Sequence, residues 1–509
     1  MENSPLSPKL LSRFYEVLIL LRVLDQVQGE KIAGETPHND ITQDIKTVEM
    51  RRRVLYHLCV ICDFRKGGFT VTAIAAENVP SGPRYWMAAN GQVNKIKTFL
   101  FEVLKMLENR SLSTQQEAQA SCFKDELFKK FVAFQRLRVK AYWKLLQPGI
   151  EEELERMSRT PLPHQGASRS LCWTCYQGFS LPSLTNHPGY KTWLQGFQSP
   201  LQKTCDFHEL CELAYSERLS AFNRVEYDLV FEKRVVEESQ ARRDIRHYIG
   251  RLSTLRRATE LLSRAADQCP GMFQQFELHH LASGASSERP NTRAKLTLDG
   301  IANRMFSKKS SESEEFRNLL QRMEESGSIM QRVLEHYSDK NWRPSIHAEL
   351  ALLEVMHERQ CTFYDDDKFI ACSKAACFCC YHYICSHPGA FARPACHNKV
   401  HRNWKPPKSA FAAEDPQNLR QRDIINNLTA EVRKAVVARV LRQRSRRWHA
   451  DSSTGITPSV IPVSQPPMYP IDTGETDVSR VIRRSSGDNT FDRVGSGFDD
   501  DEDGGVALP

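Results

Sequence analysis

The first 66 residues carry apolar side chains at helical spacing. The clearest helix is predicted over 47–63, with an apolar face made of Val48, Leu55, Leu58 and Cys62. An earlier apolar run over 14–24 is interrupted by Glu16 and Arg22. This run therefore predicts an amphipathic helix and not a signal peptide or a membrane span.

After residue 67 the pattern becomes that of strands. A β-branched run over 68–77 and a second run over 84–90 each predict a strand, and two prolines and a glycine predict a turn at 80–83. The second predicted strand ends at Asn90.

Between about 95 and 340 the pattern is again helical. Three long helical patterns run over 123–145, 214–269 and 312–337. The middle pattern alternates charges densely, which predicts long helices that project into solvent. From about 450 the chain is dominated by small and polar residues and ends in an acidic run at 499–503, so we expect a disordered tail.

Composition places the chain among folded proteins. With 509 residues, 40% of them apolar and 26% charged, it is long enough for two or three domains or one large elaborated domain. Its 15 cysteines are dispersed and no secretory signal precedes them. We therefore expect reduced thiols in the cytoplasm or nucleus, and no membrane partner.

Two short motifs carry the candidate chemistry. His347-Ala-Glu349 opens a predicted helix, for which Ser345 is the expected N-cap. About thirty residues later, Cys377 and Cys380 form a Cys-x-x-Cys after a short β-prone run, at the point where a new helix should begin. The positive end of a helix favours thiolate over thiol.

These residue types predict a zinc site. One imidazole from His347 and two thiolates from Cys377 and Cys380 would leave the fourth tetrahedral position for water. Glu349, two residues beyond the histidine, could take the proton from that water without binding the metal. Cys372 and Cys379 offer other ligand combinations, and all of these cysteines could instead be buried apolar residues.

The motifs resemble the zinc-dependent cytidine deaminase-like superfamily. The run Cys372-Ser-Lys-Ala-Ala-Cys377-Phe-Cys-Cys380 is most similar to a fungal-expanded branch of toxin-related predicted nucleic-acid or nucleotide deaminases. The runs that start at His387-Pro-Gly and at Trp404-Lys-Pro-Pro are similar to that branch as well. The sequence departs from many deaminases at Ala376, where proline is common; proline there only shapes the first helical turn.

The resemblance implies an α/β fold, an α-β-α sandwich around a mixed sheet, here elaborated by a large all-helical region. It implies a Zn²⁺ cofactor held by His347, Cys377 and Cys380, with Glu349 as the proton shuttle. The implied substrate is a cytosine or adenine base, either in a small molecule or in single-stranded nucleic acid. The alternative function is a catalytically silent, zinc-stabilised interaction protein; protein partners are not indicated.

A helix, two strands and a terminal asparagine are how a deaminase domain normally starts, so we expect a split domain. Residues 1–94 would hold N-terminal helices and the first strands, 95–340 a helical insertion, 341–449 the catalytic core with a basic C-terminal helix, and 450–509 the tail. The alternative is an independent N-terminal domain before a self-contained deaminase domain. In the split arrangement Asn90 would bind substrate; otherwise it only ends a strand.

Three further features are less specific. Trp404, Tyr381 and His382 could stack on a base or belong to the core. Basic residues over 433–447 could hold nucleic-acid phosphates, serve as a nuclear-import patch or form a solvated helix end. A second, structural metal site could form from Cys172, Cys175, Cys205 and His208, with Cys211 nearby, although the last three also fit one face of a helix.

Overall fold

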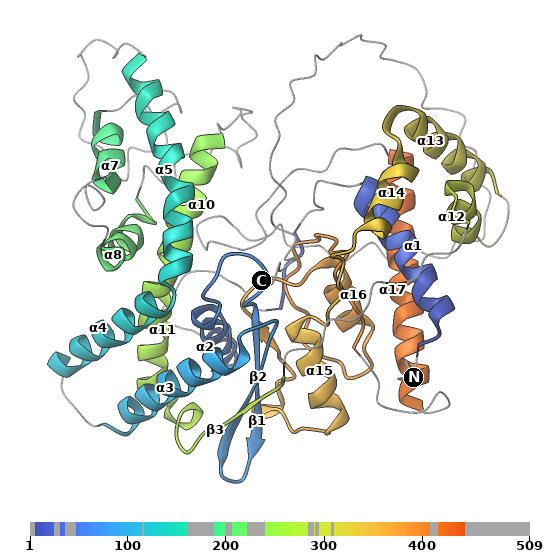
Figure 1. Ribbon diagram of the computed structural model, residues 1–509. Coiled ribbons are helices and arrows are strands. Elements are labelled where there is room, and N and C mark those ends of the chain that lie inside the picture. The colour runs from blue at the N-terminus through green and yellow to red at the C-terminus, as the bar shows by residue number, and fades with distance from the viewer. Residues whose placement is uncertain are drawn as a thin grey trace, which may run out of the picture.

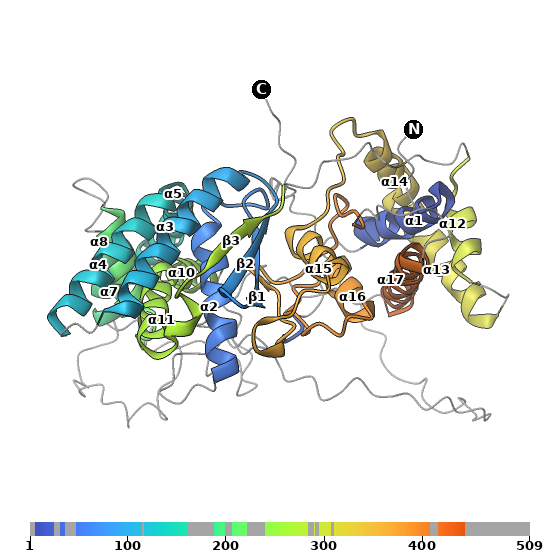
Figure 2. The same cartoon turned by 90° about the horizontal axis from the view of Figure 1, so that it is seen from below.

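The protein is described by a computed structural model, in which the described residues are 6–24, 31–35, 47–113, 117–159, 188–198, 206–220, 240–282, 290, 295–306, 310–407 and 416–442. Within them a four-stranded mixed sheet lies between two groups of helices, as Figures 1 and 2 both show. This arrangement confirms the predicted α/β fold class. The predicted tail at 450–509 lies outside the described residues.

The sheet is built from distant parts of the chain in the order β3-β2-β1-β4. Strands β1 (Thr72–Val79) and β2 (Gly82–Ala89) form the predicted antiparallel hairpin. Strand β4 (Ala371–Cys372) pairs antiparallel with β1, and β3 (Glu277–His280) pairs parallel with β2. The hairpin therefore lies in one sheet with the strand that precedes the cysteine motif, as expected for a split domain. The domain boundaries themselves remain predictions.

The two faces of the hairpin belong to two hydrophobic cores. Side chains of a strand alternate between faces, and one set, Ile74, Ala76, Tyr85 and Met87, packs into the core of one helical group. The other set, Ala73, Ala75, Trp86 and Ala88, packs into the core that also holds the cysteine motif. Three of these four residues are alanine, and such small side chains allow the helix over 348–358 to pack close to the sheet.

The first face is covered by helices from the region expected to be an insertion, together with α2 (Thr47–Cys62), the helix predicted over 47–63. They are α3 (Val93–Leu112), α4 (Glu117–Phe134), α5 (Arg136–Arg159), α7 (Pro188–Gln198), α8 (Phe207–Glu217), α10 (Gln240–Leu252) and α11 (Thr254–Gln268), followed by the 3₁₀ turn η3 (Pro270–Met272).

The second face is covered by α15 (Ala348–Glu358), and α16 (Phe378–Ser386) packs against α15, with the 3₁₀ turn η4 (Tyr364–Asp366) between them in sequence. Behind these two helices lies an outer layer, visible in both views (Figures 1 and 2). It consists of α1 (Pro8–Leu24), α12 (Leu298–Met305), α13 (Ser311–Gly327), α14 (Ile329–Ser338) and α17 (Pro416–Arg442).

The region 95–340 differs from its prediction in three ways. It is not wholly helical, because it supplies β3 to the sheet. Its long patterns are broken: α4 and α5 meet at Gln135, α10 and α11 at Ser253, and α13 and α14 at Ser328, whose φ is +47°. Helices α10 and α11 do not project into solvent, because their apolar faces lie in the core.

The apolar run over 14–24 forms most of α1, as expected, but this helix is more deeply buried than an amphipathic surface helix. Nearly every residue from Phe14 to Leu24 is buried. Even the charged Glu16 lies inside, where Arg304 of α12 pairs with it at 2.8 Å. Among the described residues, we find no helix with the length and apolar character needed to cross a bilayer.

Candidate metal centre

The histidine motif lies at the start of α15, on the second face of the sheet. The helix begins after His347, which occupies the N-cap position in an extended backbone conformation, with φ −72° and ψ 147°. The expected N-cap Ser345 lies further out, where it pairs with Trp404 across a short parallel bridge. The first backbone N–H of the helix, at Ala348, donates instead to the side-chain oxygen of Asn90 at 3.0 Å.

The cysteine motif lies at the start of α16, as the sequence predicts. Cys377 is the N-cap residue, and its sulfur accepts a hydrogen bond from the backbone N–H of Cys380 at 3.4 Å. An N-cap acceptor satisfies one of the free N–H groups of the first turn. The same position exposes the sulfur to the positive end of the helix, which stabilises a thiolate.

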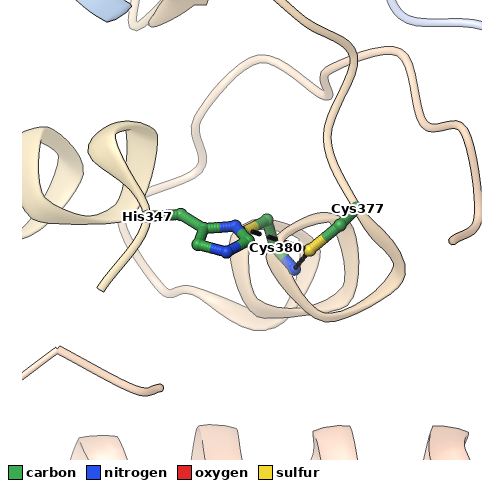
Figure 3. Close-up of side chains that lie close together, drawn as sticks. All are labelled: His347, Cys377 and Cys380. Carbon is green, nitrogen blue, oxygen red and sulfur yellow. Dashed lines mark hydrogen bonds between the residues drawn. The ribbon is translucent and has the colours of Figure 1, made fainter. Parts of the chain in front are cut away.

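Three potential ligand atoms converge between these two helix ends (Figure 3). The Nδ1 atom of His347 lies 3.7 Å from the Cys377 sulfur and 3.3 Å from the Cys380 sulfur. The three ligand atoms all lie within 4.8 Å of one another, and no other such group of three occurs among the described residues. One imidazole and two thiolates are a donor set that suits Zn²⁺, and three protein ligands leave one position open.

The charges on these neighbouring groups shift one another's pKa values. Burial opposes the charge on His347, but the neighbouring Cys377 thiolate and Glu349 raise its pKa to about 9. Burial also opposes the Cys377 thiolate, yet hydrogen bonding from Cys380 and the charge on His347 hold the pKa of Cys377 well below its usual value. Burial and the nearby thiolate raise the pKa of Cys380 well above its usual value. Metal binding would therefore have to displace protons from His347 and Cys380.

Glu349 lies beside this group without belonging to it. It is in the first turn of α15 and is 6% exposed. One carboxylate oxygen is 3.9 Å from the His347 Nδ1 atom, and the other is 3.9 Å from the sulfur of Cys372. Burial and this carboxylate raise the pKa of Cys372 well above its usual value, which disfavours a Cys372 thiolate as a further ligand.

Asn90 and Trp404, the two predicted substrate contacts, are placed differently. Asn90 follows the end of β2, and its Oδ1 atom accepts a hydrogen bond from the backbone N–H of Ala348. Its Nδ2 atom donates to the carbonyl of Gly68 at 2.8 Å. Trp404 is fully buried behind the cysteines, so its ring has no open face for a base in this structure. Its indole N–H donates to the Cys380 sulfur at 3.3 Å.

Sequence reasoning missed a polar cluster behind the site. Glu354, on α15, accepts hydrogen bonds from Tyr383 and from Arg420 of α17, both at 2.6 Å. Burial opposes its charge, but hydrogen bonds from His387 and Tyr383 and the charge of Arg420 lower the pKa of Glu354. In the sequence, this cluster is indicated only by charged or polar residues on otherwise apolar helix faces. That pattern does not show which residues will contact one another.

His401 also lies at the site without having been predicted. Its ring centroid is 5.9 Å from that of His347 and 5.7 Å from that of His397. The segment that carries both histidines runs alongside the cysteine motif, because Cys396 pairs with Ala376. This segment has no regular secondary structure, so no periodicity could have predicted its position.

The proposed second metal site is mostly outside the described residues, where Cys172, Cys175 and Cys205 lie. The remaining candidates, His208 and Cys211, are on α8. The ring of His208 packs on Phe128 at 4.4 Å, and Cys211 is fully buried in the helical core.

Part of the basic cluster over 433–447 is described, as the end of α17. Lys434 pairs with Glu431 at 2.7 Å. Arg439 donates to the carbonyl of Leu24 at 3.1 Å, so this basic residue ties α17 to the end of α1.

Comparison with known proteins places a deaminase-like segment at this site. Residues 346–408 match a protein-family model described as OTT_1508-like deaminase. No curated protein matches the chain, and no solved structure does. The matched segment contains His347, Glu349, Cys377 and Cys380. It thus supports the resemblance to deaminases over these residues, while the dependence on zinc and the fungal branch stay predictions.

Proposed function

We propose that this protein is a zinc-dependent hydrolytic deaminase. Its substrate would be an amino-bearing nucleobase, cytosine or adenine, either free or within a nucleic acid. Support comes from the match to a deaminase family over 346–408 and from the His/Cys/Cys group inside the matched segment.

His347, Cys377 and Cys380 would hold the metal. When bound there, zinc supplies a Lewis acid that makes water acidic near neutral pH. The chain itself fixes the ligand atoms through two helix ends, because His347 and Cys377 are the N-cap residues of α15 and α16. Cys377 and Cys380 are buried, whereas the His347 side chain remains 18% exposed.

Glu349 would move the proton. The reaction replaces a ring C–NH₂ with C=O, so that one water is consumed and one ammonia is released. The Glu349 carboxylate would accept a proton from the attacking water and return it to the departing amine, as the conserved glutamate does in other zinc deaminases. The distance of 3.9 Å between Glu349 Oε1 and His347 Nδ1 supports this role.

The position of Glu349 is the observation that carries this proposal. A structural zinc site is closed by four protein ligands. Here three ligand atoms converge and the next group is a buried carboxylate, which bonds the thiol of Cys372. A carboxylate beside a three-ligand centre would be suited to proton transfer, whereas a purely structural centre gains nothing from it.

Asn90 would help to bind the substrate at the rim. Its Nδ2 atom carries two hydrogens, one of which goes to the carbonyl of Gly68. The other would donate to the substrate, while the side-chain oxygen continues to cap α15 at Ala348.

The test is ammonia release from a panel of nucleosides, nucleotides, single-stranded DNA and single-stranded RNA. We expect at least one class to be deaminated by the zinc-loaded protein. Glu349→Gln should lower that rate by on the order of 10² to 10⁴, the usual contribution of a general acid–base group.

The matched control is Glu358→Gln, the same chemical change near the other end of α15. It should leave the rate close to that of the unchanged protein. Absence of ammonia from every substrate, or full activity in Glu349→Gln, would refute the proposed function.

A further inference from the structure

The indole of Trp404 makes an unusual buried contact. Trp404 and Cys380 are both fully buried, and the indole N–H lies 3.3 Å from the Cys380 sulfur. A buried tryptophan N–H needs an acceptor. The acceptor here is a sulfur that belongs to the His/Cys/Cys group.

The position of Trp404 is fixed from several sides. Its ring packs against Phe14 of α1 at 5.4 Å between centroids and against Tyr383 of α16 at 6.2 Å. The hydroxyl of Tyr15, also on α1, donates to the backbone carbonyl of Trp404 at 3.0 Å. Helix α1 thus holds both the ring and the backbone of a residue 389 positions away from Tyr15.

We propose that Trp404 is a positioning residue of the metal centre and that α1 acts on the centre through it. This inference rests on the proposed function in one respect: Cys380 must be a metal ligand. A donated N–H directs the sulfur toward the other two ligands and stabilises its thiolate form.

The competing explanation is that Trp404 only fills space in the core. The two explanations are separated by a change that keeps an aromatic ring and removes the N–H, Trp404→Phe. Groups that orient metal ligands typically contribute 10- to 100-fold to metal affinity. A core residue that only fills space would lower stability and leave metal affinity unchanged.

The chain offers a matched control in Trp342. It is also fully buried, and its ring packs against Tyr15 at 5.7 Å and against Tyr337 at 5.4 Å. Its indole N–H donates at 3.0 Å to a backbone carbonyl, that of Arg402, and not to a sulfur. Trp342→Phe therefore makes the same chemical change in the same layer without touching a ligand.

The experiment uses the full chain and measures metal binding directly. Zn²⁺ affinity is obtained by competition with a chelator, and Co²⁺ loading reports the thiolate-to-metal charge-transfer absorption. We expect Trp404→Phe to lose roughly 10- to 100-fold in affinity and to shift the charge-transfer band. Trp342→Phe should retain the affinity and the band of the unchanged protein.

Equal metal affinity and equal spectra in the two variants would overturn the inference, even if both variants were less stable. Should Trp404→Phe fail to fold, Tyr15→Phe removes only the hydroxyl that holds the Trp404 backbone. Tyr15→Phe should lower metal affinity in the same direction by a smaller factor, and unchanged affinity would overturn the inference. An unchanged protein that binds no metal would instead refute the proposed function.

Discussion

The two faces of the sheet each bury a polar cluster, and the two clusters differ in how they are satisfied. On the face covered by α2 and α5, Asp63 pairs with Arg138 at 2.6 Å, with both side chains almost fully buried. Arg138 also donates to the hydroxyl of Tyr142, as does Arg251. Burial opposes ionisation of Tyr142, but the two guanidinium charges lower its pKa to about 8.

On the other face, His347, Cys377 and Cys380 bring three soft donors together. The groups of the first cluster are satisfied by one another through an ion pair and hydrogen bonds, whereas the second cluster brings together three side chains that could hold a metal ion. We therefore expect the first cluster to contribute to stability and the second to contribute to metal binding. The two are also connected, because Asp63 accepts a hydrogen bond at 3.2 Å from Ser373, in the segment that leads to Cys377.

The largest effect should come from removing a ligand at the second cluster. Cys377→Ser should lose the single zinc ion expected per chain and, with it, the deaminase activity, because a hydroxyl is a poor substitute for a thiolate ligand. The control is Cys379→Ala, since Cys379 is fully buried on the same helix but lies outside the ligand group. Elemental analysis should find zinc in the control only. Full zinc in Cys377→Ser with unchanged stability would contradict the ligand set.

The next effect should come from breaking the first cluster. Arg138→Met leaves the buried Asp63 charge without its partner and should cost about 3–5 kcal/mol of unfolding free energy. Asp63→Asn combined with Arg138→Met should cost less than Arg138→Met alone, because no uncompensated charge remains. Denaturant unfolding measures both, and zinc content should persist in both. A cost of about 1 kcal/mol or less, as for an exposed pair, would contradict the structural role of this cluster.

A smaller effect is expected at Glu354. It lies on helix α15 like Glu349, but its carboxylate accepts hydrogen bonds from Tyr383 and Arg420. Glu354→Gln should cost about 1.5–3 kcal/mol, the range for hydrogen bonds to a charged group, and should retain zinc. The variant to compare with it is Glu349→Gln, which should keep the unfolding free energy of the unchanged protein but have a lower rate of deamination. Loss of zinc in Glu354→Gln would contradict a purely structural role for Glu354.

The pH dependence of the same variant sharpens this comparison. The pKa of Glu354 is lowered in the folded protein, so its contribution is fully present above the unfolded value, about 4.3, and is lost as pH falls through the folded value. The difference in unfolding free energy between the unchanged protein and Glu354→Gln should therefore shrink as the pH falls below about 4. A difference that stays constant in acid would mean that the carboxylate charge contributes nothing.

The sequence by itself determined the parts that depend on local spacing. The pairing of His347-Ala-Glu349 with Cys377-x-x-Cys380, the helix over 47–63 and the hairpin that ends at Asn90 follow from short-range patterns. The periodicity of helices and strands, the residue types of turns and the residue types that bind metals can all be recognised in short stretches of sequence. For the same reason the open coordination position and the neighbouring carboxylate could be proposed before any fold was known.

Only the tertiary structure decided which distant residues complete the centre. Trp404 turned out to face the Cys380 sulfur, and Asn90 to cap α15. Strand β3 lies in a region with a helical pattern and pairs with β2, for example Glu277 with Arg84. Because these partners are about 190 positions apart in the chain, the local pattern could not predict the pairing. Contacts such as that of Tyr15 with Trp404 span 389 positions. They arise from packing two cores against one sheet, and no local pattern encodes them.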